Sequence, residues 1–124
     1  MTSPAPRRRG ERGAVTAELA MGLPLLVAVT TGLVWLLAVG TAQVRAVDAA
    51  RETARAVARG DDLSAAIGRG AEVAPDGAAV RVSTGAGEVR VVVTAAVSGP
   101  GGLFDFLPSV PLRAAAVAAA AAPP

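Results

Sequence analysis

The chain has 124 residues and a mass of 12.2 kDa, so it can hold one small folded domain and a further segment, but not two domains. Hydrophobic residues make up 52% of it and aromatic residues only 2%, a composition too apolar for intrinsic disorder. The sequence contains no cysteine and no histidine, which excludes disulfides and thiolate metal sites and removes the commonest general base. A net charge of +2 with few aromatic residues gives no reason to expect nucleic-acid binding. We therefore expect no enzymatic activity, no catalytic residues, no cofactor and no metal site.

The first segment, residues 1–13, is polar and rich in proline, glycine and arginine. It carries four arginines, Arg7, Arg8, Arg9 and Arg12, against a single acid, Glu11. We interpret residues 1–13 as a basic leader peptide in contact with water.

The second segment, residues 14–44, is apolar and carries one formal charge, at Glu18. The uncharged stretch between Glu18 and Arg45 is long enough to cross a hydrocarbon core of about 30 Å as a helix. We therefore predict a transmembrane helix over residues 14–44 in a lipid bilayer. Pro24 predicts a helix kink, because proline removes one backbone hydrogen bond.

Residues 45–60 continue the helical pattern into water. Small apolar residues recur on one face, and the other face carries three arginines with two acids spaced to pair at three-residue offsets: Arg51, Arg55, Arg59, Asp48 and Glu52. We expect the arginine stripe to be a solvated helix face. Gly60 is expected to end this helical extension.

The last segment, residues 61–124, predicts a small α+β domain. Asp61 or Asp62 is placed to cap a short helix that ends near Val73, and no third ligand lies near these two acids to make a metal site. Two alternating segments, residues 78–83 and 88–98, predict a β-hairpin. Valines recur on one face of each: Val80 and Val82 on the first, and Val89, Val91, Val93 and Val97 on the second.

The alanine-rich tail is compatible with helix or strand over residues 110–122, and we expect a third strand. The fold class is thus α+β: a long N-terminal helix, a short helix and an antiparallel sheet of two to three strands. Before the tail, residues 99–109 hold both phenylalanines, Phe104 and Phe106, and we expect this loop to fold over the sheet rather than form a docking patch. A domain of about 65 residues has a marginal core, so it needs support from the long helix or a partner.

The junction of leader and apolar helix, RRRGERG followed by AVTAELAMGLPLL, places Gly13 at the end of a basic segment and Glu18 five residues later. This pattern resembles a type IV prepilin signal, and the chain resembles the TadE-like pilin-like proteins of tight-adherence (Tad) systems. The resemblance implies cleavage between Gly13 and Ala14 by a membrane prepilin peptidase, with Glu18 kept in the helix for assembly. Ala14 stands where major pilins commonly have phenylalanine, so the resemblance points to a minor pilin or pseudopilin.

The same resemblance implies partners and a location. The partners are the prepilin peptidase, other pilin-like subunits and an inner-membrane assembly platform of a Tad-like assembly or secretion system. The protein would cross the cell membrane once, with a cytoplasmic N-terminus, an extracytoplasmic C-terminal domain and a place in or beside a surface filament.

Two functions other than a pilin-like subunit also fit this sequence. The first is a single-pass anchor with a partner-binding domain in the envelope, neither cleaved nor part of a filament. The second is a secreted protein released near Thr41 or Gln43, although its apolar stretch exceeds the 7 to 15 residues usual for a signal peptide. In either case Glu18 could be a solvated interfacial acid. A carboxylate at mid-bilayer costs about 2.5 to 3.5 kcal/mol, which together with Gly13 and the leader favours a functional role.

Overall fold

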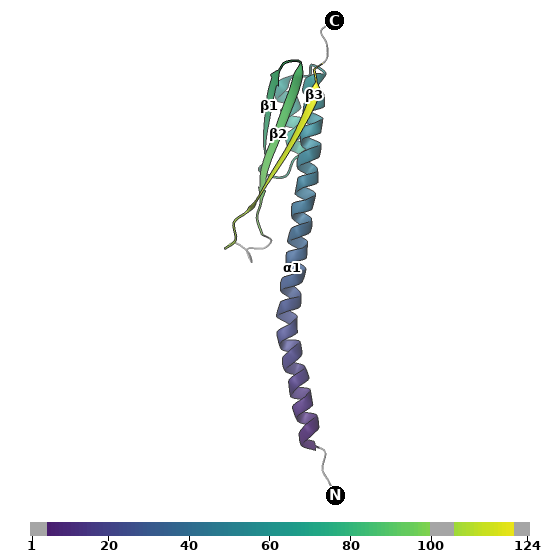
Figure 1. The fold of residues 1–124 in the computed structure, drawn as a ribbon, viewed down its shortest axis with the longest axis vertical. Helices are drawn as coiled ribbons and strands as arrows, with labels where there is room; N and C mark the ends of the chain where they lie inside the picture. Colours follow the sequence, from purple (N-terminus) through teal and green to yellow (C-terminus); the bar gives the residue numbers. More distant parts are fainter. Residues whose placement is uncertain (1–4, 100–105, 121–124) are drawn as a thin grey trace. The chain divides into compact units, whose positions relative to one another are not determined.

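The computed structural model of the chain describes residues 5–99 and 106–120. Figure 1 shows the element order, which is α1 (Ala5–Ala58), α2 (Leu63–Val73), β1 (Ala79–Gly85), β2 (Glu88–Val97) and β3 (Val110–Ala119). The three strands form one antiparallel sheet in the order β1-β2-β3. The predicted α+β class is confirmed, and the alanine-rich tail forms the third strand. By their contacts the residues fall into two units, Met1–Val34 and Trp35–Pro124.

Helix α1 is continuous from Ala5 to Ala58 and passes through Pro24. Residues 5–13 of the predicted leader are therefore helical. Helix propagation is easier than nucleation, and no stop signal separates these residues from the apolar segment. Pro6 stands in the first turn, where a missing N–H leaves no hydrogen bond unmade. The backbone thus marks no boundary between leader and apolar helix, and the predicted limits within α1 stay a prediction.

Glycine ends α1 as predicted. Gly60 has a φ of +92°, and its N–H donates to the Val57 carbonyl at 3.0 Å while the Asp61 N–H donates to the Ala56 carbonyl at 3.1 Å. This is the Schellman arrangement, which satisfies two carbonyls at the helix end. Asp62 then caps α2, since its carboxylate accepts from the Ala65 N–H at 3.2 Å.

The β1–β2 hairpin has a two-residue loop, Ala86 and Gly87, between the paired residues Gly85 and Glu88. Both loop residues have positive φ, +53° and +77°, as a type I′ turn requires. The register places Val80 opposite Val93 and Val82 opposite Val91, so Val80 and Val82 share one face of the sheet with Val89, Val91 and Val93. Val92 lies on the other face, opposite Arg81.

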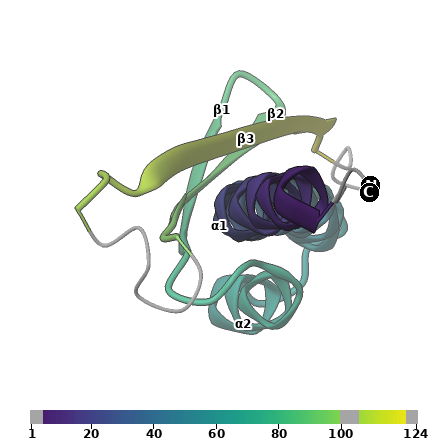
Figure 2. The ribbon, with the colours of Figure 1, turned by 90° about the horizontal axis from the view of Figure 1, so that it is seen from below.

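The core of the second unit lies between this valine face and the C-terminal part of α1. Val89, Val91 and Val93 are fully or almost fully buried, and they face α1 alanines that are buried as completely: Ala46, Ala49, Ala50 and Ala54. In Figure 2 the sheet lies on one side of the C-terminal part of α1 and α2 on the other. The expected support from the long helix is confirmed, because α1 supplies one wall of the core.

The predicted loop over the sheet lies partly outside the described residues, since residues 100–105 are not among them. Phe104 is one of these. Phe106 is 78% exposed and Leu107 40% exposed, so neither side chain belongs to the buried core.

Two glycines of α2 differ sharply in their surroundings. A Cβ at Gly70 would overlap the hydroxyl oxygen of Thr53, whereas a Cβ at Gly68 would meet nothing within 4 Å. Thr53 is itself fully buried and donates its hydroxyl to the Ala49 carbonyl at 2.8 Å. Gly70 is therefore the residue that lets α2 approach α1.

Replacing Gly68 and Gly70 by alanine is expected to change the stability of the domain in opposite directions. Gly68→Ala removes a flexible residue from an exposed helix and is expected to stabilise the domain by about 0.5 to 1 kcal/mol. Gly70→Ala gains the same propensity but overpacks the contact with Thr53, and is expected to destabilise the domain by about 1 to 3 kcal/mol. Thermal unfolding of the full-length chain in detergent, followed by circular dichroism, measures both changes.

The variant Thr53→Ala supplies the control, because it removes the overlapping hydroxyl. On this background Gly70→Ala is expected to be less destabilising than in the unmutated chain. Equal melting temperatures for Gly68→Ala and Gly70→Ala would contradict the close α1–α2 contact.

Candidate functional site

The N-terminal part of α1 is an apolar helix without cover from the rest of the described chain. Helix residues Gly10–Ala58 contain a window with a mean hydropathy of 2.1, none of which is buried, so by length and composition the helix can cross a membrane. Large apolar side chains remain more than half exposed along it, including Leu19, Leu25 and Leu37. Such a surface is stable in lipid or against other helices, not in water.

Threonine side chains in this helix satisfy their own polar groups. The hydroxyls of Thr16, Thr30 and Thr31 each donate to the backbone carbonyl four residues earlier, at 2.8 Å. These hydroxyls therefore need no partner from outside the helix, which suits an apolar surrounding.

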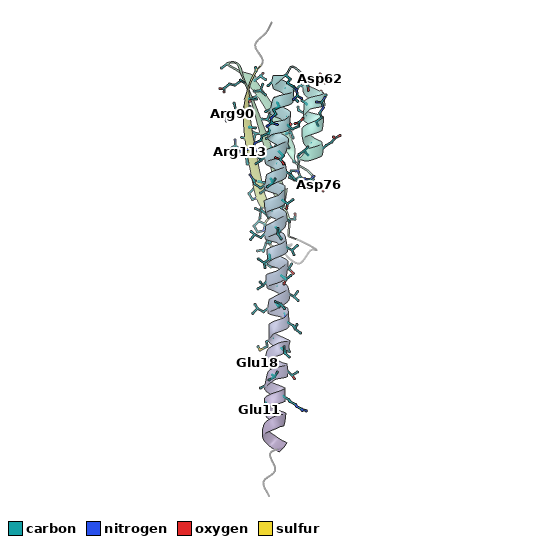
Figure 3. The ribbon with its side chains drawn as sticks, turned by 90° about the vertical axis from the view of Figure 1, so that its right-hand side faces the viewer. Glu11, Glu18, Asp62, Asp76, Arg90 and Arg113 are labelled. Atoms are coloured by element: carbon teal, nitrogen blue, oxygen red, sulfur yellow. The ribbon has the colours of Figure 1, made fainter. Side chains whose placement is uncertain are left out.

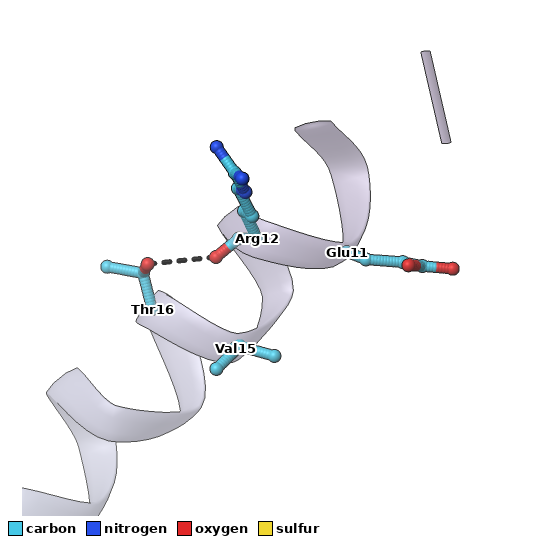
Figure 4. A pocket seen from close by; sticks show the side chains of 4 residues that line it. All are labelled: Glu11, Arg12, Val15 and Thr16. Carbon is cyan, nitrogen blue, oxygen red and sulfur yellow. Dashed lines mark hydrogen bonds between the residues drawn. The ribbon is translucent and has the colours of Figure 1, made fainter. Parts of the chain in front are cut away.

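The predicted cleavage site, Gly13 and Ala14, lies inside α1, and both residues are exposed. A Cβ at Gly13 would meet no atom within 4 Å, so the packing of this chain does not require glycine there. Figure 4 shows the helix turn around the site, with a shallow depression of about 380 Å³ among the side chains of Glu11, Arg12, Val15 and Thr16. One helix alone forms its walls, so the depression encloses no ligand.

Glu18 projects from the exposed surface of α1, as Figure 3 shows. Within the described residues its carboxylate makes no ion pair and accepts no hydrogen bond. In contrast to the threonines, Glu18 has no hydrogen-bond or ion-pair partner among the described residues. A group that neutralises its charge must therefore come from another molecule or from the membrane surface.

Pro24 leaves one backbone group without its usual helical partner. Its nitrogen has no hydrogen, so the Ala20 carbonyl four residues earlier loses the normal donor. The helix still continues on both sides.

The acids near the start of α2 have structural partners. Asp61 pairs with Arg59 at 3.2 Å and with Arg69 at 3.1 Å, and Asp62 is the helix cap already described. Among residues 5–99 and 106–120 no group of three or more acidic residues is placed to hold a metal ion.

Arg51, Arg55 and Arg59 are exposed, as predicted for a solvated helix face of α1, but the ion pairs permitted by the spacing are absent from the described residues. The expected pairs Asp48–Arg51 and Glu52–Arg55 are not among the ion pairs of the described residues. These are long, solvated side chains, for which a surface pair gains little over hydration. The four residues line, together with Val73, an open depression of about 340 Å³, whose mixed charges select no particular ligand.

Arg45 has a role that the sequence analysis missed. Its guanidinium reaches from α1 to the C-terminus of α2, where it donates to the carbonyls of Val73 and Ala74, each at 3.1 Å. A cation at this end also complements the helix dipole. The sequence shows a positive charge directly after the apolar segment, but it does not show which group this charge contacts. The Val73 carbonyl lies 28 residues further along the chain.

Comparison with known proteins gives one family. Residues 13–55 match the family model described as "TadE-like protein". No match was found among curated proteins or among solved structures. The match begins at Gly13, includes Glu18 and Pro24, and ends inside the part of α1 that carries the domain. The resemblance predicted from the sequence is confirmed for this segment: residues 13–55, the greater part of α1, are similar to the TadE-like family.

Proposed function

We propose that the chain is a structural minor pilin or pseudopilin of a Tad-like assembly or secretion system. The observation that carries the proposal is Glu18, an unpaired carboxylate on an exposed apolar helix inside the TadE-like segment. The protein acts in this proposal by packing with other pilin-like subunits and the membrane assembly platform, without catalysis or a cofactor. In this proposal the chain crosses the membrane once, with its N-terminus in the cytoplasm, where the prepilin peptidase cuts, and residues 61–124 outside.

Processing by a prepilin peptidase after Gly13 is part of the proposal. A peptide bond inside a helix must be unwound before a peptidase can hydrolyse it. Glycine lowers helix stability by about 1 kcal/mol relative to alanine and has no side chain to obstruct an enzyme, while the chain's own packing has no need of it at position 13. These properties support Gly13 as the residue that the peptidase recognises.

The processing prediction concerns Gly13→Leu and Gly13→Arg. Both variants are expected to remain as the longer precursor, because a large side chain fills the space that the enzyme needs. N-terminal sequencing and intact mass of the protein from membranes are the measurements, with Ala14 expected as the first residue of the unmutated mature chain.

Gly10→Leu is the matched control. Gly10 is also an exposed helical glycine with nothing within 4 Å, yet it lies outside the predicted site, so this variant is expected to be cut normally. A mature N-terminus at Met1 or Thr2 would instead support the uncleaved anchor, and one near Thr41 or Gln43 would support secretion.

Removal of the leader creates a positively charged group that can pair with Glu18 of a neighbouring subunit. Cleavage creates a positive amine at Ala14, four residues before Glu18 and about 6 Å from it along the helix axis. Each charge is costly in an apolar setting, and an opposite charge on a neighbouring subunit would neutralise both. A subunit displaced along the assembly axis can bring its amine to this carboxylate.

The assembly prediction compares Glu18→Ala and Glu18→Gln with the unmutated chain. Membrane insertion is expected to be unchanged or improved, because a costly charge is removed, and cleavage is expected to persist. Recovery of other pilin-like subunits with the processed protein is expected to fall in both variants. Crosslinking followed by co-purification measures it.

The Gln variant tests charge separately from size. Glutamine keeps the shape and hydrogen-bonding capacity of the side chain but cannot form an ion pair. Equal recovery of partners by all three proteins would show that Glu18 is only a solvated acid, and the plain membrane anchor would then be the better function.

A further inference from the structure

The outer face of the sheet is basic. Each strand contributes one exposed arginine, Arg81 from β1, Arg90 from β2 and Arg113 from β3, because these positions alternate with the buried ones. We call these three residues the basic sheet face. Within the described residues, none of their guanidinium groups makes a hydrogen bond or an ion pair. The described strand residues contain one acid, Glu88, which leaves the sheet with a net charge of +2.

The arginines of this face repel one another. Arg81 lies opposite Val92, so Arg81 and Arg90 are diagonal neighbours on adjacent strands, about 7 to 8 Å apart at their Cα atoms. Their other neighbours on this face are small, among them Ser83, Thr94, Ala115 and Val117. Glu88 lies on the same face two residues from Arg90 and makes no ion pair within the described residues. The face is thus a surface of small side chains with a net positive charge.

The opposite side of the domain is acidic. Residues 61–77 contain four acids and one arginine, a net charge of −3. Asp61 is already paired, but Glu72 and Asp76 are exposed and make no ion pair within the described chain. We call Glu72 and Asp76 the acidic α2 side. In Figure 3, Arg90 and Arg113 lie on one side of α1 and Asp62 and Asp76 on the other.

We propose that the basic sheet face of one copy of this chain binds the acidic α2 side of a second copy. The charges on the two surfaces are complementary, both surfaces belong to the same domain, and α1 separates them, so one copy cannot satisfy its own charges. Guanidinium groups bind carboxylates with two parallel hydrogen bonds, which gives such a contact direction as well as attraction.

The contact joins two different surfaces and is therefore heterologous. Repeating a heterologous contact produces a ring or an open-ended array rather than a closed dimer. The inference deepens the proposed function and rests on it, since it names the contact by which the domains of neighbouring subunits would meet.

The experiment uses two differently tagged copies of the full-length chain, co-expressed and purified together from membranes in detergent. The sheet variant is Arg90→Glu with Arg113→Glu, and the α2 variant is Glu72→Arg with Asp76→Arg. A third variant carries all four changes, which reverses both surfaces and restores their complementarity. Arg51→Glu, on an exposed and unpaired position of α1, controls for a general change of net charge.

Recovery of one tagged copy with the other is expected to fall at least about fivefold for the sheet variant and for the α2 variant, because like charges then face each other. The four-change variant is expected to recover most of the loss, which a merely misfolded domain would not do. Arg51 lies beside Val73 of α2, so Arg51→Glu adds negative charge next to the acidic α2 side and does not oppose the sheet arginines. This variant is therefore expected not to lower recovery.

The chain has no cysteine, so introduced cysteines report the contact without background. Ala115→Cys on the sheet face of one copy and Ala71→Cys on exposed α2 of the other are expected to crosslink more than two copies of either variant alone.

Two outcomes would overturn the contact. Unchanged recovery for both reversed variants would show that the domains do not meet through these charges. A four-change variant as deficient as the sheet variant would show that the arginines serve a different anionic partner. In both cases association that still depends on Glu18 would leave the proposed function intact, whereas no association between unmutated processed copies would count against the proposed function itself.

Discussion

The packing of β2 valines against α1 alanines is the contact on which the C-terminal domain depends. Besides Thr53, the largest fully buried side chains are Val89, Val91 and Val93, and the opposing wall of the core is built from alanines that bring the backbones close. So small a core cannot be separated from its helix, because residues 61–124 alone would expose the valine face to water. A single helix thus presents large apolar side chains to its surroundings near the N-terminus and alanines to the domain near the C-terminus.

Local sequence signals predicted most of this fold. The period of two in β1 and β2, Gly60 at the end of α1 and Asp62 at the start of α2 all act over a few residues, so their effect can be inferred without tertiary contacts. Strand β3 was the ambiguous element, since a run of alanine has a helical propensity, and pairing with β2 overrides it. Gly68 and Gly70 are indistinguishable in sequence, because only the approach of Thr53 separates them.

In the candidate site, too, some features could be predicted from the sequence and others required the structure. The spacing of Gly13 and Glu18 is a local property and was available from the sequence, whereas their helical backbone and exposure required the structure. The ion pairs expected along the α1 stripe were wrong because spacing permits a surface pair without making it favourable against hydration. The hydrogen bonds of Arg45 were missed for the opposite reason, since the carbonyls it binds are distant in the chain.

The two proposed contacts between subunits would respond differently to salt. A pair between the Ala14 amine and Glu18 lies on an apolar helix, where the low dielectric strengthens the attraction and mobile ions have little access. The pair of sheet arginines and α2 acids is exposed to solvent, where the Debye length falls from about 10 Å at 0.1 M to about 3 Å at 1 M salt. Raising the ionic strength is therefore expected to release the domains first while the helices remain associated. The helix contact would then provide the strength of the assembly, and the domain contact would select which faces of neighbouring subunits meet.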